Sequence, residues 1–208
     1  MKIFCFIVSA VFAYCVSGLN PAIIMSKAIY KKDIREYGSG NPGFTNFKRV
    51  FGNKYAWFVF ALDILKGAVI AVSAGLLFRQ YVGSWQLGVA YAGIFALLGH
   101  AFPVFYGFKG GKAISVGLAA SIAVDWRVGC IALGTFIIVF ICSKIVSLSS
   151  LCGAVALIVA GVLFSVFVAP CVPDIILSAF VGLVAIIMHR ENIKRLIKGE
   201  EKRFLPKK

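Results

Sequence analysis

Long apolar runs recur along most of this chain, and they constrain its fold more than any other feature. Three runs, residues 3–26, 55–78 and 85–106, are as long as the roughly 20 residues that a helix needs to cross a bilayer. Further runs follow at 113–124, 128–143, 150–169 and 174–188. Backbone in lipid must satisfy its own hydrogen bonds, which favours helices for such segments. The pattern therefore predicts an all-α integral membrane protein.

The composition supports a membrane protein and excludes an ordinary soluble domain. Hydrophobic residues make up 61% of the chain, charged residues 14%, and the mean hydropathy is +0.93. The 208 residues suit one unit, so residues 1–208 are expected to form a single membrane-embedded domain. The excess of basic residues lies in loops between apolar runs, which is typical of membrane topology and not of nucleic-acid binding. Six scattered cysteines without a C-x-x-C pair predict small apolar side chains and no metal site.

The distribution of Lys and Arg predicts the number of crossings and their direction. With seven helices and the N-terminus outside, the inner segments are 27–54, 107–112, 144–149 and 189–208. They hold seven, two, one and eight basic residues, which is 18 of the 22, against three in the outer segments. Such a bias marks the cytoplasmic side. Omitting the short run 113–124 would spoil the split, so we expect seven transmembrane helices, the N-terminus outside and the C-terminus cytoplasmic.

The first apolar run allows two interpretations. One Lys followed by an apolar stretch is also typical of a cleaved signal peptide. The run continues beyond any plausible cleavage site, which favours a retained first helix. The pair Asn20-Pro21 is expected to kink this helix.

Two glycine-rich polar stretches interrupt the apolar sequence on the predicted cytoplasmic side. The first reads Ser39-Gly-Asn-Pro-Gly-Phe-Thr-Asn-Phe-Lys-Arg49. Its glycines predict a turn, and Ser39, Asn41, Thr45 and Asn46 offer short polar side chains. Arg49 is expected on a brief helix, where a guanidinium binds phosphate through two hydrogen bonds. The alternative is a solvated loop with a helix cap at Thr45 or Asn46.

The second stretch runs from Gly99 to Lys112 and contains Lys109-Gly-Gly-Lys112. Gly110-Gly111 at the start of a short helix predicts a nest of free amides, where anions are favoured by N–H groups and by the helix dipole. This is not a Walker loop, because Tyr106 and Ala113 replace its Gly and its Ser or Thr. The alternative is a cationic turn at the membrane interface.

Other polar residues are less informative by themselves. Asp63 and Lys66 lie on one face of a predicted span. Such a pair faces the bundle interior, and a structural ion pair is as well supported as a functional one. His100 is expected at a helix end. His189 gains weight because Glu191 and Asn192 follow it at the exit of the last helix.

In combination, these blocks resemble the bacterial acyl-phosphate:glycerol-3-phosphate acyltransferase family, PlsY. Two departures from the family pattern are visible. Phe44 stands where the family usually has a small residue and is expected to reshape the loop. Ala113 replaces the usual Gly after Gly-Gly-Lys and is expected to stiffen the nest, since Ala tolerates positive φ poorly. Six blocks carry the resemblance, in order along the chain: Ser39–Asn46, Leu62–Gly67, Gly99–Pro103, Gly107–Lys112, Ser147–Ser150 and His189–Asn192.

The resemblance implies transfer of a fatty acyl group from acyl phosphate to the 1-hydroxyl of glycerol 3-phosphate, forming lysophosphatidic acid. It implies seven helices in the bacterial inner membrane, with the active site facing the cytoplasm. It also implies no metal, no cofactor, no acyl-CoA and no obligate protein partner. The sequence agrees that the H-x₄-D box of other acyltransferases is missing, because positions 105 and 194, five residues beyond His100 and His189, are Phe and Lys.

The resemblance also implies roles for individual residues. The catalytic set that orients glycerol 3-phosphate is Ser39, Arg49, His189 and Asn192. The proton of the attacking hydroxyl goes either to the substrate's own phosphate or to His189 as general base. Substrate-binding residues are Lys109, Gly110, Gly111 and Lys112 for the acyl-phosphate group, Asn41, Thr45 and Asn46 for the shape of the pocket, and Ser147 and Ser150 as further phosphate donors.

A transporter or channel for an anionic, phosphate-bearing solute is the competing class. It predicts inverted repeats and broken helices at the middle of the membrane. The sequence shows no internal repeat, and its polar blocks gather on one predicted face, which favours the enzyme.

Overall fold

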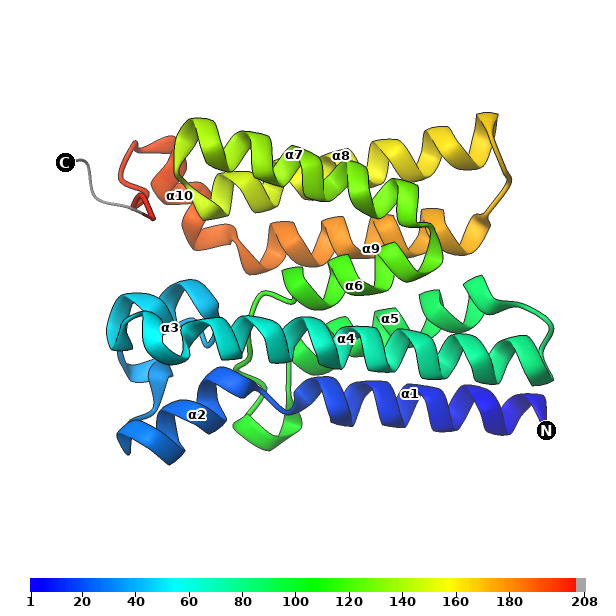
Figure 1. Ribbon diagram of the computed structural model, residues 1–208, viewed down its shortest axis with the longest axis horizontal. Helices are drawn as coiled ribbons and strands as arrows, with labels where there is room; N and C mark the ends of the chain where they lie inside the picture. Colours follow the sequence, from blue (N-terminus) through cyan, green and yellow to red (C-terminus); the bar gives the residue numbers. More distant parts are fainter. Residues whose placement is uncertain (205–208) are drawn as a thin grey trace.

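The computed structural model describes residues 1–204, and over this range the regular structure is entirely helical (Figure 1). The short helices α2, α3 and α10 gather at one end of a bundle of longer helices. In chain order the elements are α1 (Lys2–Gly18), α2 (Pro21–Tyr30), η1 (Ile34–Glu36), α3 (Phe44–Phe51), α4 (Asn53–Tyr81), α5 (Trp85–Ala101), η2 (Val104–Tyr106), α6 (Ile114–Val124), α7 (Trp126–Ser143), α8 (Val146–Phe167), α9 (Val172–Met188) and α10 (Arg190–Ile197).

The expected all-α membrane architecture is confirmed. Among the described residues, five helical segments are long and apolar enough to cross a membrane, and α9 with α10, bent by 65°, makes a sixth candidate. Helix α6 is apolar but has only 11 residues. The five segments are Lys2–Tyr30, Asn53–Tyr81, Trp85–Tyr106, Trp126–Ser143 and Val146–Phe167.

The first apolar run breaks into two helices at the expected position. Helix α1 ends at Gly18, and Asn20 begins α2 by accepting a hydrogen bond at Oδ1 from the Ile23 N–H at 3.0 Å. Pro21 suits the first helical turn, where its missing N–H costs nothing. The Asn20 amide also donates to the Pro42 carbonyl at 3.0 Å. The break therefore ties the exit of α1 to the first glycine-rich stretch.

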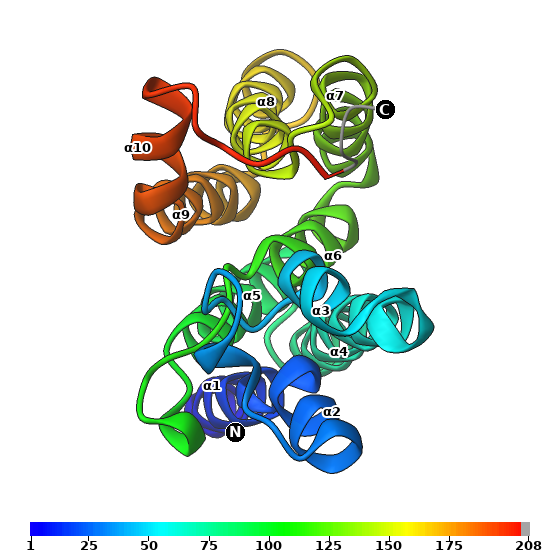
Figure 2. The ribbon, with the colours of Figure 1, turned by 90° about the vertical axis from the view of Figure 1, so that its left-hand side faces the viewer.

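The bundle has two groups of helices with α6 between them (Figure 2). One group contains α1, α4 and α5, and the other α7, α8 and α9. Close approach through glycine holds the first group together, as small residues do in membranes. A Cβ on Gly88 would lie 2.5 Å from the Ala74 oxygen, and one on Gly99 would lie 2.2 Å from the Tyr14 oxygen. Helix α6 thus stands where the groups meet, and its first residue follows the second glycine-rich stretch.

Asp63 and Lys66 form the expected ion pair, with 2.9 Å between Oδ1 and Nζ. Lys66 also donates to the Leu19 carbonyl at 3.1 Å, just beyond the end of α1. His100 Nδ1 lies 3.7 Å from the same Asp63 oxygen. Because Lys66 satisfies a carbonyl that the break in the first run leaves unpaired, these contacts favour the structural interpretation of the pair.

Candidate functional site

A polar hollow of about 420 Å³ opens at the end of the bundle where the short helices gather. Its volume is within the usual range for small-molecule sites. The hollow brings together segments that are far apart in the sequence: the first glycine-rich stretch, the second one, and α10 at the exit of α9. Predicted site residues that line it are Ser39, Asn41, Lys109, Gly110, Lys112 and Asn192, and Arg190 and Arg195 add further positive charge.

Asn46 organises the first stretch from within the protein. It is buried, its Oδ1 accepts a hydrogen bond from the Ser39 N–H at 2.9 Å, and its amide donates to the Tyr37 carbonyl at 3.0 Å. The fold around Ser39 therefore depends on Asn46. Thr45 and Arg49 lie on α3, outside the residues that line the hollow. Arg49 is exposed, and its charge acts on Lys112.

The predicted nest at Gly110-Gly111 is wrong in one respect, because its amides are not free. The Gly110 N–H donates to the Ala101 carbonyl at 3.1 Å, and the Gly111 N–H donates to the His100 carbonyl at 3.0 Å. The loop folds back onto the end of α5, and only glycine permits this approach. A Cβ on Gly110 would lie 2.0 Å from the His100 oxygen. Amides without helical acceptors are instead those of the first turn of α6, which begins at Ile114.

Ala113 adopts the left-handed conformation expected to be difficult for it, with φ 59° and ψ 12°, and it is buried. A left-handed residue with a Cβ costs about 1–2 kcal/mol, while burying one methyl group contributes about 0.8 kcal/mol. We therefore expect Ala113→Gly to raise the free energy of unfolding by about 0.5 kcal/mol. Ala113→Val should lower it, since β-branched residues fit positive φ worst. Thermal unfolding in detergent measures the stability of both variants. If the Gly variant were less stable than the Val variant, the proposed backbone strain at position 113 would be contradicted.

A hydrogen-bonded network connects the second stretch to α8 and α10. Lys112 Nζ donates to Asn192 Oδ1, and the Asn192 amide donates to Glu201 Oε1 at 2.6 Å. Ser147 donates to the same oxygen at 2.8 Å, and Arg195 Nε donates to Glu201 Oε2 at 2.6 Å. Sequence reasoning missed Glu201, for which the only signal is a pair of acidic residues within the basic C-terminal segment.

The network sets the charge state of its members. Burial lowers the pKa of Lys112 to about 8; Glu201 opposes this shift, whereas the charges of Arg195 and Arg49 add to it. Burial acts to raise the pKa of Glu201, but hydrogen bonds from Asn192, Arg195 and Ser147 outweigh it and hold that pKa below its usual value. Glu201 is therefore an anion at neutral pH, and Lys112 stays largely a cation.

His189 caps the end of α9 and is buried. Its Nδ1 lies 2.8 Å from the Ala185 carbonyl, which can only accept, so Nδ1 carries the proton. Burial lowers the pKa of His189 to about 4, and the charge of Lys112 adds to this. An imidazole with so low a pKa is a weak general base at neutral pH.

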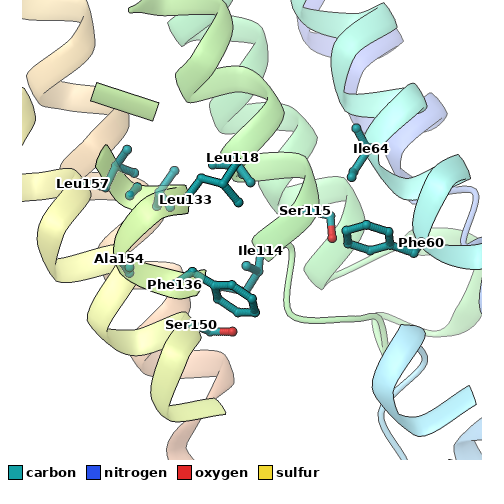
Figure 3. A pocket seen from close by; sticks show the side chains of 13 residues that line it. Phe60, Ile64, Ile114, Ser115, Leu118, Leu133, Phe136, Ser150, Ala154 and Leu157 are labelled. Atoms are coloured by element: carbon teal, nitrogen blue, oxygen red, sulfur yellow. The ribbon is translucent and has the colours of Figure 1, made fainter. Parts of the chain in front are cut away.

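An apolar groove lies between the two helix groups (Figure 3). Phe60 and Ile64 of α4 face Leu133 and Phe136 of α7 across it, with Leu118 of α6 between them. Ile114 and Ser115, the first residues of α6, line it as well. Ile114 lies two residues beyond Lys112, which lines the polar hollow. No periodic pattern predicts the groove, since its lining comes from five helices.

Ser150 and Phe44 lie in or beside this groove. Ser150 lines it and donates to the Val146 carbonyl at 2.9 Å, so this geometry does not support its expected role as a phosphate donor. Phe44 packs with 4.8 Å between its ring centre and that of Trp57, and 5.4 Å to that of Phe60. The larger residue at position 44 therefore thickens the aromatic wall near Phe60.

A cationic hollow lined by Lys112 and an apolar groove lined by Ile114, two residues further along the chain, define a membrane protein able to hold a phosphate head group and a hydrocarbon chain. The chain matches the profile of the family described as glycerol-3-phosphate acyltransferase over residues 7–199. It is 40% identical over 202 residues to the glycerol-3-phosphate acyltransferase of Thermoanaerobacter pseudethanolicus, covering 95% of each chain. It is 38% identical over 197 residues to that of Listeria monocytogenes, covering 94% of each.

Solved structures agree. The fold is similar to the crystal structure of PlsY, an integral membrane glycerol 3-phosphate acyltransferase, in its glycerol 3-phosphate form, with a TM-score of 0.82, 32% identity and 96% of each chain covered. The lysophosphatidic acid form of PlsY gives a TM-score of 0.78 at 31% identity, covering 95% of this chain and 94% of that one. The site therefore belongs to an acyltransferase embedded in a membrane. This chain is a member of the glycerol-3-phosphate acyltransferase family.

Proposed function

We propose that this chain transfers a fatty acyl group from acyl phosphate to the 1-hydroxyl of sn-glycerol 3-phosphate, forming lysophosphatidic acid in the first acylation of phospholipid synthesis. Family membership supports the acceptor and the product. One observation supports the donor: Lys112 lines the cationic hollow, and Ile114, two residues further along the chain, lines the apolar groove. A phosphate held by the lysines would place an attached acyl chain in the groove.

The proposed chemistry requires positioning more than a covalent nucleophile. The 1-hydroxyl oxygen attacks the acyl carbonyl carbon, the bond from that carbon to the phosphate oxygen breaks, and inorganic phosphate leaves. Lys109 and Lys112 stabilise the developing charge on the leaving phosphate. Ser39, Arg49 and Asn192 orient the acceptor. The low pKa of His189 favours the substrate's own phosphate as the group that takes the hydroxyl proton.

An assay with two donors tests the proposal. Purified protein is incubated with radiolabelled glycerol 3-phosphate and either palmitoyl phosphate or palmitoyl-CoA, and labelled lysophosphatidic acid is measured. We expect product with palmitoyl phosphate and little with palmitoyl-CoA. Comparable rates with the two donors would overturn the donor assignment. Absence of product with both would overturn the function and return the anion transporter to consideration.

The same proposal includes seven crossings of the bacterial inner membrane, with α6 as a short span, the N-terminus outside and the active site facing the cytoplasm. The arrangement supports it, because the N-terminus lies at the opposite end of the bundle from α10 (Figure 1). The inner segments that the charge count predicts hold 18 of the 22 basic residues. The polar hollow is lined from three of these segments.

Cysteine labelling in intact cells tests this topology, after the six native cysteines are replaced. A cysteine at Gln80, which is exposed at the end of α4, should react with an impermeant thiol reagent. A cysteine at the exposed Lys202 should react only after the cells are permeabilised. The reverse pattern would invert the orientation. Labelling of both positions in intact cells would contradict the odd number of crossings proposed between them.

A further inference from the structure

Two Asp-x-Arg motifs with the same local geometry lie at opposite ends of the bundle. In Asp33-Ile-Arg35, the carboxylate accepts hydrogen bonds from the Arg35 N–H at 3.0 Å, from Nε at 3.0 Å and from Nη2 at 2.8 Å. In Asp125-Trp-Arg127, the corresponding distances are 2.9, 2.9 and 2.6 Å. Each Asp also caps the helix that follows it. The motif is therefore complete as a local structure at both ends.

The two arginines differ in what else they contact. Arg35 Nη1 donates to the Tyr106 carbonyl at 2.8 Å and approaches the Lys109 carbonyl at 3.5 Å. Its guanidinium also lies 5.8 Å from the centre of the Tyr106 ring. The guanidinium of Arg127 instead lies 4.9 Å from the ring centre of Phe164, and within residues 1–204 its hydrogen bonds go to Asp125 alone. In the part of the chain that the structure describes, only the motif at the site end forms hydrogen bonds to a segment distant in the sequence.

The segment that Arg35 contacts contains successive tight turns. Tyr106 and Phe108 donate to the Pro103 carbonyl at 3.1 and 2.9 Å. Gly107 and Phe108 both have positive φ, at 63° and 59°, and a left-handed Phe costs about 1–2 kcal/mol. A strained turn of this kind persists when its surroundings hold it. Arg35 supplies that support through its hydrogen bond to the Tyr106 carbonyl. This contact lies three residues before Lys109, which lines the polar hollow.

We propose that Arg35, held in place by Asp33, is a positioning residue for the acyl-phosphate site. It lies outside the residues that line the hollow and acts through the backbone at Tyr106 and Lys109. By fixing these carbonyls, it presents the Lys109 ammonium and the Gly110 backbone to the donor phosphate. The inference rests on the proposed function, since it assigns Arg35 to one of the two substrates of that reaction.

Matched variants at the two motifs test the proposal. The kcat and KM values for palmitoyl phosphate and for glycerol 3-phosphate are measured for Arg35→Lys and Arg127→Lys. Lys keeps the charge, but its ammonium group cannot form the hydrogen bonds that the planar guanidinium makes at once to Asp33 and to two backbone carbonyls. We expect Arg35→Lys to raise KM for palmitoyl phosphate about tenfold, as loss of a charged hydrogen bond does. In Arg35→Lys the KM for glycerol 3-phosphate should change less than about twofold. In Arg127→Lys neither KM value should change by more than about twofold.

Chemical rescue separates positioning from a general loss of structure. Methylguanidinium added to Arg35→Ala should recover a substantial part of the lost affinity for palmitoyl phosphate, because it restores the missing fork to a preformed space. If Arg35→Ala does not fold, Asp33→Asn, which leaves the arginine without its carboxylate, should raise the same KM about threefold. Unchanged kinetics in Arg35→Lys would overturn the proposal. Where Arg35→Ala does not fold, unchanged kinetics in Asp33→Asn would do the same. An equal rise in both KM values would also do so. A wild-type protein that makes no lysophosphatidic acid would instead overturn the proposed function.

Discussion

Gly110→Ala is expected to lower kcat/KM for acyl phosphate at least about 100-fold, the loss that a displacement of about 1 Å causes in a positioned site. The new Cβ would lie 2.0 Å from the His100 oxygen and 2.8 Å from the Ala101 oxygen. Both are backbone atoms at the end of α5, so neither can move aside as a side chain would. The loop must therefore leave α5, and the hydrogen bond from the Gly110 N–H to Ala101 breaks with it. Lys109 and Lys112 then lose their positions.

Gly107→Ala is the matched control, because it lies in the same loop. Gly107 has a φ of 63°, but a Cβ there would meet no atom within 4 Å. The Gly107→Ala substitution should cost only the strain of positive φ, about 1–2 kcal/mol of stability, and the variant should retain most of the activity. Steady-state kinetics and thermal unfolding of the two variants make the comparison. A Gly110→Ala enzyme as active as Gly107→Ala would contradict the role assigned to this close approach.

The helices of this fold were predictable from the sequence because hydropathy is a local property. The run 128–143 corresponds to α7 at Trp126–Ser143, and the short run 113–124 corresponds to α6 at Ile114–Val124. Asn20-Pro21 marked the break between α1 and α2 because both residues act on their own neighbourhood. The basic residues predicted that the glycine-rich stretches and the exit of the last helix share one end of the bundle, and the structure places them together there.

Contacts made across the bundle were not predictable in the same way. The amides of Gly110 and Gly111 looked free because their acceptors, the carbonyls of Ala101 and His100, depend on how the loop folds back. Glu201 enters the site only because the chain returns over the end of α8 after α10 (Figure 2). Arg35 reaches a carbonyl 71 residues away. Such partners depend on tertiary packing, and no spacing in one sequence encodes them.

Lys112 is expected to give the enzyme an alkaline limit about 2.5 pH units lower than an ordinary lysine would. Burial lowers its pKa to about 8, with Arg195 and Arg49 adding repulsion against the attraction of Glu201. The cation is needed for a phosphate dianion and is present below that pKa. It is lost as pH rises through it. Since kcat/KM reports the ionisation of the free enzyme, its value for acyl phosphate should fall about tenfold for each pH unit above 8.

Two substitutions at Lys112 assign this limit to its ammonium group. Lys112→Arg keeps a positive charge at every accessible pH, so the fall above pH 8 should disappear even if the altered geometry lowers the rate. Lys112→Met removes the charge and should lose about 10- to 150-fold at pH 7, the cost of a hydrogen bond to a charged group. The measurement is kcat/KM for palmitoyl phosphate from pH 6 to 9.5, corrected for spontaneous hydrolysis of the donor. A wild-type profile that stays flat to pH 9.5, or an Arg variant with the same fall, would show that Lys112 does not carry this ionisation.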